Sequence, residues 1–155
     1  MIYVFDTNSL SELNAYYPDI FKSLWNQLDE LVAAGEVIST REVYSELNRS
    51  GLEHAIKWAA ANPGLFTVPS VKETAFVATI FKVPHFQMLI DQKAQLRGTP
   101  VADPFVIACA YAHQGTVVTQ EKLKPNAAKI PNVCAHFKVP CIDLKGFMVA
   151  HSWSF

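Results

Sequence analysis

The chain has 155 residues, of which 50% are hydrophobic, and its 13 Lys and Arg nearly balance its 14 Asp and Glu. This length and apolar content suit one folded domain over residues 1–155 and exclude a disordered chain, a collagen-like fibre and a coiled coil. A net charge of −1 argues against a strongly basic nucleic-acid binder. The charge is uneven, however, because residues 1–53 carry nine acidic and three basic side chains, whereas residues 54–155 carry five and ten.

The predicted strands are short, largely apolar runs, typical of parallel strands that are buried on both faces. They lie at residues 2–5, 37–39, 65–68, 116–119 and 141–142. The predicted helices show apolar residues at helical spacing. They lie at residues 18–34, 41–49, 51–62, 71–81, 84–96 and 105–113.

Four polar side chains are predicted to cap helices at their N-termini. Thr40 precedes the helix over residues 41–49, and Asp103 stands before Pro104 at a favoured helix start. Asn132 and Asp143 would each cap a short helix near the end of the chain. Strands that alternate with helices in this way predict an α/β fold with a mostly parallel central sheet.

The cysteine content and the first residues predict a reduced, cytoplasmic protein that does not bind membranes. Three cysteines in a chain of this length do not form a secreted disulfide framework. The start MIYVFD lacks the basic region of a signal peptide. The longest apolar run, residues 105–112, is far shorter than the ~20 residues that a membrane helix needs.

Four carboxylates follow predicted strands or begin predicted helices. In open α/β sheets the working crevice lies beyond the carboxyl ends of the strands. Asp6 follows the first strand, Glu46 lies on the helix after the second, Asp103 begins its own helix, and Glu121 follows the strand at 116–119. We expect these acids to converge, although each has an ordinary alternative role as a cap, a turn residue or a solvated charge.

A cluster of like charges is costly unless a cation neutralises it. Hard divalent ions such as Mg²⁺ and Mn²⁺ prefer oxygen ligands, activate water and stabilise phosphoryl transition states. The acids therefore favour phosphodiester hydrolysis. A Rossmann dinucleotide site is disfavoured, because residues 6–10 contain no glycine after the first strand.

Four segments resemble the motifs of the PIN-like nuclease family. VFDTNSL is similar to its first motif, VISTREVYSEL to its second with Glu46, and VADPFVIACA to its third with Asp103. GTVVTQEK is similar to its fourth, with Glu121 where the family pattern has Asp. The resemblance implies a three-layer α/β/α sandwich around a mostly parallel sheet and RNA cleavage that depends on Mg²⁺ or Mn²⁺.

Many small members of this family are VapC-type toxins, so the resemblance also implies an antitoxin partner and a homodimer. Asp6, Glu46 and Asp103 would hold the metal, and Glu121 would complete the acidic set or orient the attacking water. Thr7, Asn8 and Thr119 would position these carboxylates through hydrogen bonds. Glu42, four residues before Glu46 on the same helix face, is a second candidate for the helix carboxylate.

Lys122, Lys124 and Lys129 follow Glu121 in a polar loop and are candidates for phosphate contacts with RNA, the alternative being a solvated loop. The main competing function is a catalytically inactive PIN-like module that binds RNA or protein. Cys134, His136 and Cys141 are close in sequence, but their spacing fits no usual zinc pattern.

Overall fold

A computed structural model describes residues 1–90 and 101–155. Its centre is a five-stranded parallel sheet in the order β3-β2-β1-β4-β5. The strands are β1 (Tyr3–Phe5), β2 (Val37–Thr40), β3 (Phe66–Thr67), β4 (Thr116–Val118) and β5 (Cys141–Ile142). The α/β fold with a parallel sheet is thus confirmed, and each observed strand overlaps a predicted one.

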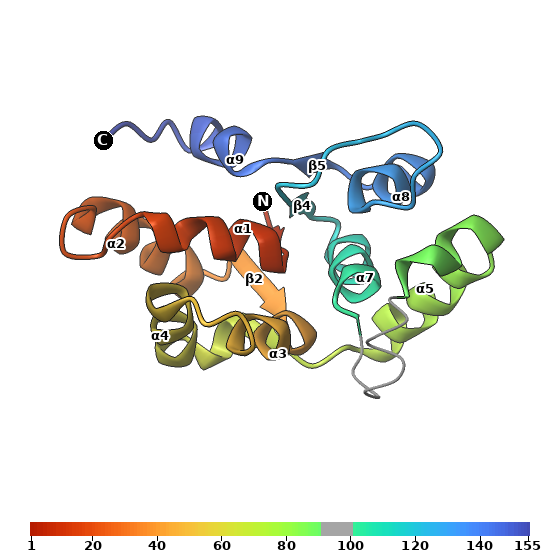
Figure 1. The fold of residues 1–155 in the computed structure, drawn as a ribbon, viewed down its shortest axis with the longest axis horizontal. Helices are drawn as coiled ribbons and strands as arrows, with labels where there is room; N and C mark the ends of the chain where they lie inside the picture. The colour runs from red at the N-terminus through yellow and green to blue at the C-terminus, as the bar shows by residue number, and fades with distance from the viewer. Residues whose placement is uncertain (91–100) are drawn as a thin grey trace.

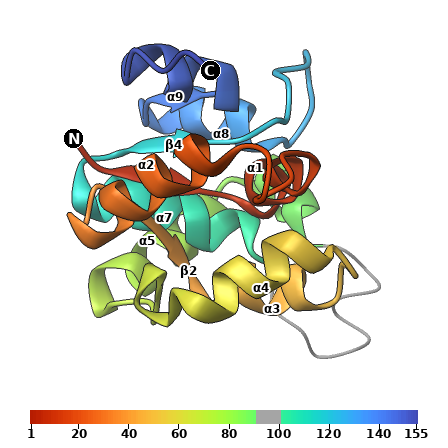
Figure 2. The same ribbon diagram turned by 90° about the vertical axis from the view of Figure 1, so that its left-hand side faces the viewer.

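Helices cover both faces of the sheet. Their bounds are α1 (Thr7–Glu12), α2 (Lys22–Ala33), α3 (Arg41–Asn48), α4 (Glu53–Ala61), α5 (Val71–Phe81), α7 (Asp103–His113), α8 (Ile130–Phe137) and α9 (Leu144–Ala150). Figure 1 shows α1, α2 and α9 on one side of the strands and α5, α7 and α8 on the other. Figure 2 shows α8 and α9 near one edge of the sheet and α3 and α4 near the other. The predicted three-layer arrangement is therefore present.

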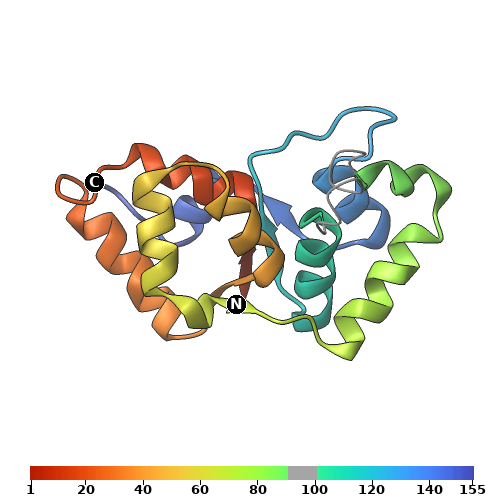
Figure 3. The ribbon, with the colours of Figure 1, turned by 60° about the horizontal axis from the view of Figure 1, so that its bottom comes forward.

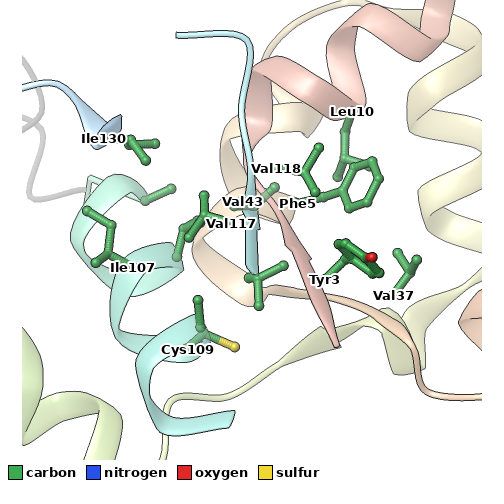
Figure 4. Packing of buried hydrophobic residues seen from close by; sticks show 14 of the residues in the cluster. Tyr3, Phe5, Leu10, Val37, Val43, Ile107, Cys109, Val117, Val118 and Ile130 are labelled. Atoms are coloured by element: carbon green, nitrogen blue, oxygen red, sulfur yellow. The ribbon is translucent and has the colours of Figure 1, made fainter. Parts of the chain in front are cut away.

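The core lies on both faces of β1 and β4, whose six residues are all buried. Figure 4 shows Phe5 and Leu10 on one side of β4 and Ile107 on the other. Phe147 of α9 packs its ring edge-on against Phe5, with 4.9 Å between ring centroids. Burial on both faces explains why these strands appear in the sequence as continuous apolar runs.

The turn from α7 into β4 requires a glycine. Gln114 ends the helix in the left-handed conformation, and the amide of Thr116 donates to the carbonyl of Ile2 at 2.9 Å. A Cβ atom on Gly115 would lie 2.6 Å from that carbonyl oxygen. Only glycine permits this close approach of β4 to the start of β1.

Several predicted helix bounds are wrong. The helix expected over residues 18–34 begins at Lys22, because residues 16–21 form turns. A helix was expected over residues 84–96. Its first part is a 3₁₀ helix, Pro84–Leu89, which Ile90 ends, and residues 91–96 lie outside the described residues. The helix α1 was not expected at all, since TNSLSE carries little apolar periodicity.

Two of the four predicted caps are correct. The Thr40 hydroxyl accepts from the amide of Val43, and the Asp143 carboxylate accepts from the amide of Gly146. The prediction for Asn132 is wrong, because α8 begins earlier, at Ile130, and Asn132 lies inside its first turn. Asp103 is also not a cap, as described below.

No helix in residues 1–90 and 101–155 is long and apolar enough to cross a membrane.

Candidate active site

Asp6 follows β1 and caps α1, and the residue is only 2% exposed. Its Oδ1 accepts hydrogen bonds from the backbone amide and the hydroxyl of Ser9, both at 2.8 Å. Its Oδ2 accepts from the hydroxyl of Thr119 at the end of β4. Burial raises the pKa of Asp6 to about 6 despite these hydrogen bonds, and the charge of Glu121 adds to the rise.

Glu46 is held from two sides. The Thr7 hydroxyl donates to its Oε2 at 2.6 Å, and the backbone amide of Ala102 donates to its Oε1 at 3.0 Å. These donors lie at the first residue of α1 and just before α7, so the carboxylate of α3 joins the starts of two other helices. Hydrogen-bond donors of this kind fix the orientation of a carboxylate, as they do for carboxylates that bind metal ions.

Asp103 is the first residue of α7, and its side chain does not cap the helix. Ala102 occupies the cap position, and its carbonyl accepts the first helical hydrogen bond from Val106. The predicted cap was therefore displaced by one residue, because Pro104 occupies the second helical position rather than the first. Among the described residues no donor bonds to the Asp103 carboxylate, which leaves both oxygens available.

The charges of the other three acids act on Asp103. Burial raises its pKa to about 7, and the charges of Glu121, Glu46 and Asp6 each add to the rise. The charge of Lys129 opposes it. We call these four residues, Asp6, Glu46, Asp103 and Glu121, the acidic cluster. These effects agree with the expected convergence of the four carboxylates, and their roles stay a prediction.

Glu121 has a structural bond as well as a place in the cluster. Its Oε2 accepts from the amide of Ile130, the first residue of α8, at 2.9 Å. Its own amide donates to the hydroxyl of Thr119 at 3.1 Å. This carboxylate therefore also anchors the N-terminus of α8, where the helix dipole favours a negative charge.

The hydroxyl residues named from the sequence have different positions. Thr7 and Thr119 bond to Glu46 and Asp6, as their predicted positioning role requires. Asn8 is exposed, and its side chain bonds to none of the described residues. Ser9 was missed, although the pattern Asp-x-x-Ser at a helix start is a recognisable cap signal.

Glu42 and Glu46 point to different neighbours although they lie one turn apart on α3. Glu42 is 3% exposed, and its Oε1 accepts from the Nε of Arg41 at 3.0 Å. Its charge acts on Cys109 of α7, whereas the charge of Glu46 acts on Asp103. Glu46 is therefore the α3 carboxylate that belongs to the acidic cluster.

The three lysines also differ. Lys122 forms an exposed ion pair with Asp143 at 3.4 Å, and Lys124 is exposed. Lys129, just before α8, is the one whose charge acts on Asp103. A pocket opens beside Glu121 and is lined by Thr119, Glu121, Lys122, Leu123, Pro131, Ala135, Val139, Cys141, Ile142 and Asp143.

A family model matches residues 3–155, and it describes a domain of unknown function, DUF4411. The chain belongs to the DUF4411 family. No curated protein matches the chain. The family assignment therefore covers almost the whole chain without stating an activity.

Two solved structures are similar to this DUF4411 member. VapBC2 from Rickettsia felis, crystallised bound to a DNA fragment from their promoter, is 17% identical with a TM-score of 0.52 over 92% of this chain and 98% of that chain. PAE2754 from Pyrobaculum aerophilum is 19% identical with a TM-score of 0.49 over 97% and 96%. The likeness to VapBC2 shows that the two chains share a fold.

Proposed function

We propose that this protein is a metal-dependent endoribonuclease whose active site is the acidic cluster. The observation that carries the proposal is Asp103, a half-buried carboxylate to which no described residue donates a hydrogen bond and whose pKa is raised to about 7 by burial and by three other acids. Such crowding destabilises the ionised cluster when it is empty, and a divalent cation would relieve it.

The donor set fits a hard cation, because the four side chains offer only carboxylate oxygens. Asp6, Glu46 and Asp103 would hold Mg²⁺ or Mn²⁺. When bound, the ion would lower the pKa of a water and stabilise charge on the phosphate oxygens. The outward-placed Glu121 would accept a proton from the attacking water or complete the negative shell.

The protein's own contribution is to fix these groups before substrate arrives. Ser9 and Thr119 hold Asp6, while Thr7 and the amide of Ala102 hold Glu46. Asp103 keeps both oxygens free among the described residues, so it can turn toward the cation. Lys129, whose charge acts on Asp103, would balance the charge of a bound RNA phosphate.

The matched pair Glu46→Gln and Glu42→Gln tests this proposal, since both residues lie on one face of α3. With single-stranded RNA and Mn²⁺, we expect Glu46→Gln to lose about a hundredfold in cleavage rate, while Glu42→Gln retains activity within about threefold. EDTA should abolish cleavage by the wild type. Cleavage that survives EDTA, or equal rates for Glu46→Gln and wild type, would overturn the mechanism.

Absence of cleavage by the wild type on every RNA tested, with RNA or protein binding retained, would favour the inactive-module alternative instead. Circular dichroism of each variant separates loss of chemistry from loss of fold.

The toxin role is a second part of the proposal. It is supported by the likeness of fold to VapBC2, which was solved on DNA from their promoter. We propose that a cognate antitoxin binds this chain in the cytoplasm and that the chain forms a homodimer. Expression without a partner should arrest growth, and Asp103→Asn should relieve the arrest. Arrest that persists in the Asp103→Asn strain would separate toxicity from the acidic cluster.

A further inference from the structure

A second group of ligand-type side chains lies between α5 and α7, apart from the acidic cluster. Glu73 is in the first turn of α5, while Cys109 and His113 are four residues apart on α7. A carboxylate oxygen, the thiol sulfur and an imidazole nitrogen of these residues all lie within 4.8 Å of one another. We call these three residues the mixed cluster. The two helices run side by side in Figure 3, on the side of the sheet away from α2 and α4.

The donor types decide which ion this geometry suits. A thiolate and an imidazole are ligands for Zn²⁺, with a carboxylate as a common third. Mg²⁺ and Mn²⁺ prefer oxygen ligands throughout. We propose that the mixed cluster is a Zn²⁺ site in which Glu73, Cys109 and His113 are the protein ligands.

The helices are already in place for such a site. The ring of Phe76, three residues after Glu73 on α5, stacks on Tyr111 of α7 with 3.8 Å between centroids. Tyr111 lies between Cys109 and His113 in the sequence, two residues from each. Glu73 is fixed by a capping box, in which its Oε2 accepts from the Ser70 amide at 2.6 Å. The capping uses one carboxylate oxygen, so the side chain is oriented while its other oxygen stays available.

An independent observation comes from Glu42, which is 3% exposed. Its Oε2 is buried and has no hydrogen-bond partner among the described residues. Its other oxygen, Oε1, pairs with Arg41, and the charge of Glu42 acts on Cys109 of α7. A buried, unpaired carboxylate oxygen is costly, and a nearby cation removes that cost. Water would supply the fourth Zn²⁺ ligand.

The three ligands also differ in access. Cys109 and Glu73 are buried, and Figure 4 shows the Cys109 side chain on α7 among the buried residues of the core. His113, the last residue of α7, is exposed. Binding would replace the thiol proton by a Zn–S bond and release that proton to solvent. The ion would then link α5 to α7.

Co²⁺ serves as a spectroscopic probe for Zn²⁺ in the full chain. We expect one Co²⁺ per chain to give a thiolate-to-metal charge-transfer band, which one equivalent of Zn²⁺ abolishes. Cys109→Ser should remove the band. Because Cys109 is buried and its replacement can disturb folding, the exposed His113→Asn is the second variant, and we expect it to weaken Zn²⁺ affinity about a hundredfold.

Two control variants identify the source of the band. Cys141→Ser should retain it, which excludes the pair formed by Cys134 and Cys141. Asp103→Asn should also retain it, since the acidic cluster offers no sulfur. The proposal is overturned if the wild type gives no band, if Cys141→Ser removes it, or if His113→Asn binds Zn²⁺ as tightly as wild type. None of these outcomes depends on nuclease activity.

Discussion

The acidic cluster and the mixed cluster both include residues of α7, the first at its start and the second further along. In the first cluster the pKa of a carboxylate is raised, and in the second it is lowered. At the start of α7, burial and the charges of other carboxylates raise the pKa of Asp103 to about 7. Beside Cys109, further along α7, the pKa of Glu73 is lowered against the effect of burial, mainly by hydrogen bonds with Ser70. The first cluster is strained without a cation, whereas the second satisfies most of its own polar groups.

This difference implies two kinds of dependence on metal. Carboxylates that are held close together need a cation if all of them are to be ionised at neutral pH. We therefore expect the ion in the acidic cluster to be required for function. The mixed cluster contains a neutral thiol when no metal is bound. We expect an ion there to stabilise a fold that forms without it. Hard and soft ligand types should also keep the two sites selective.

The largest expected effect is a separation of the two sites by mutation. Asp103→Asn should reduce Mn²⁺-dependent RNA cleavage about a hundred- to a thousandfold and leave the Co²⁺ charge-transfer band unchanged. His113→Asn should weaken the band and leave cleavage within about threefold. Cleavage assays and Co²⁺ titrations on both variants check this. Loss of both properties in either variant would mean that the sites are not independent.

A smaller effect is expected in the pH dependence of stability without metal. The folded-state pKa values of Asp6 and Asp103, about 6 and about 7, lie above the unfolded value of 3.8. The folded protein therefore binds more protons between about pH 4 and pH 7, so its stability falls as pH rises through this window. We expect the chain in EDTA to be about 1–3 kcal/mol more stable at pH 5 than at pH 8 from these groups.

Urea unfolding at both pH values measures this difference, and Asp103→Asn isolates the contribution of that residue. The variant should show a smaller loss of stability between pH 5 and pH 8 than the wild type. Mn²⁺ at pH 8 should restore stability to the wild type more than to the variant. An identical pH dependence in wild type and variant would contradict the raised pKa of Asp103.

Thr119→Val tests how Asp6 is held. The substitution removes the hydroxyl that donates to Asp6 Oδ2 and accepts from the Glu121 amide, so we expect a loss of about 1–2 kcal/mol in stability. That hydrogen bond lowers the pKa of Asp6, so its loss should raise this pKa further and move the acid limb of the pH–rate profile to higher pH. Thr116→Val, at the other end of β4, is the matched control and should leave the acid limb in place.

The sequence predicted the acidic cluster better than the mixed one, for a physical reason. The carboxyl ends of parallel strands gather at one edge of a sheet, so Asp6 and Glu121 could be placed together from local strand positions alone. Glu73 and Cys109 meet only through the packing of α5 on α7, which no local pattern encodes. The spacing of Cys109 and His113, four residues apart on one helix, was the available signal.

The errors in detail also have local causes. The choice between Glu42 and Glu46 stayed open because a shared helix face does not specify a shared neighbour, and residues one turn apart are separated by about 5 Å along the axis. Asp103 was expected to be the N-cap of α7, but it is the first residue of the helix. Proline is accepted at either of the first two helical positions, so Pro104 does not decide between these two starts. Such one-residue differences decide whether a carboxylate caps a helix or is free to bind.

The smallest expected effect concerns the lysines near the acidic cluster. The charge of Lys129 lowers the pKa of Asp103, whereas Lys122 forms a solvent-exposed ion pair with Asp143. Lys129→Ala should therefore raise KM for RNA about two- to fivefold at low salt, with a smaller effect at high salt where exposed charges are screened. Lys122→Ala should change KM less. Equal effects of the two substitutions at low salt would mean that the RNA phosphates contact the whole loop that carries the lysines. They would then have no preference for Lys129.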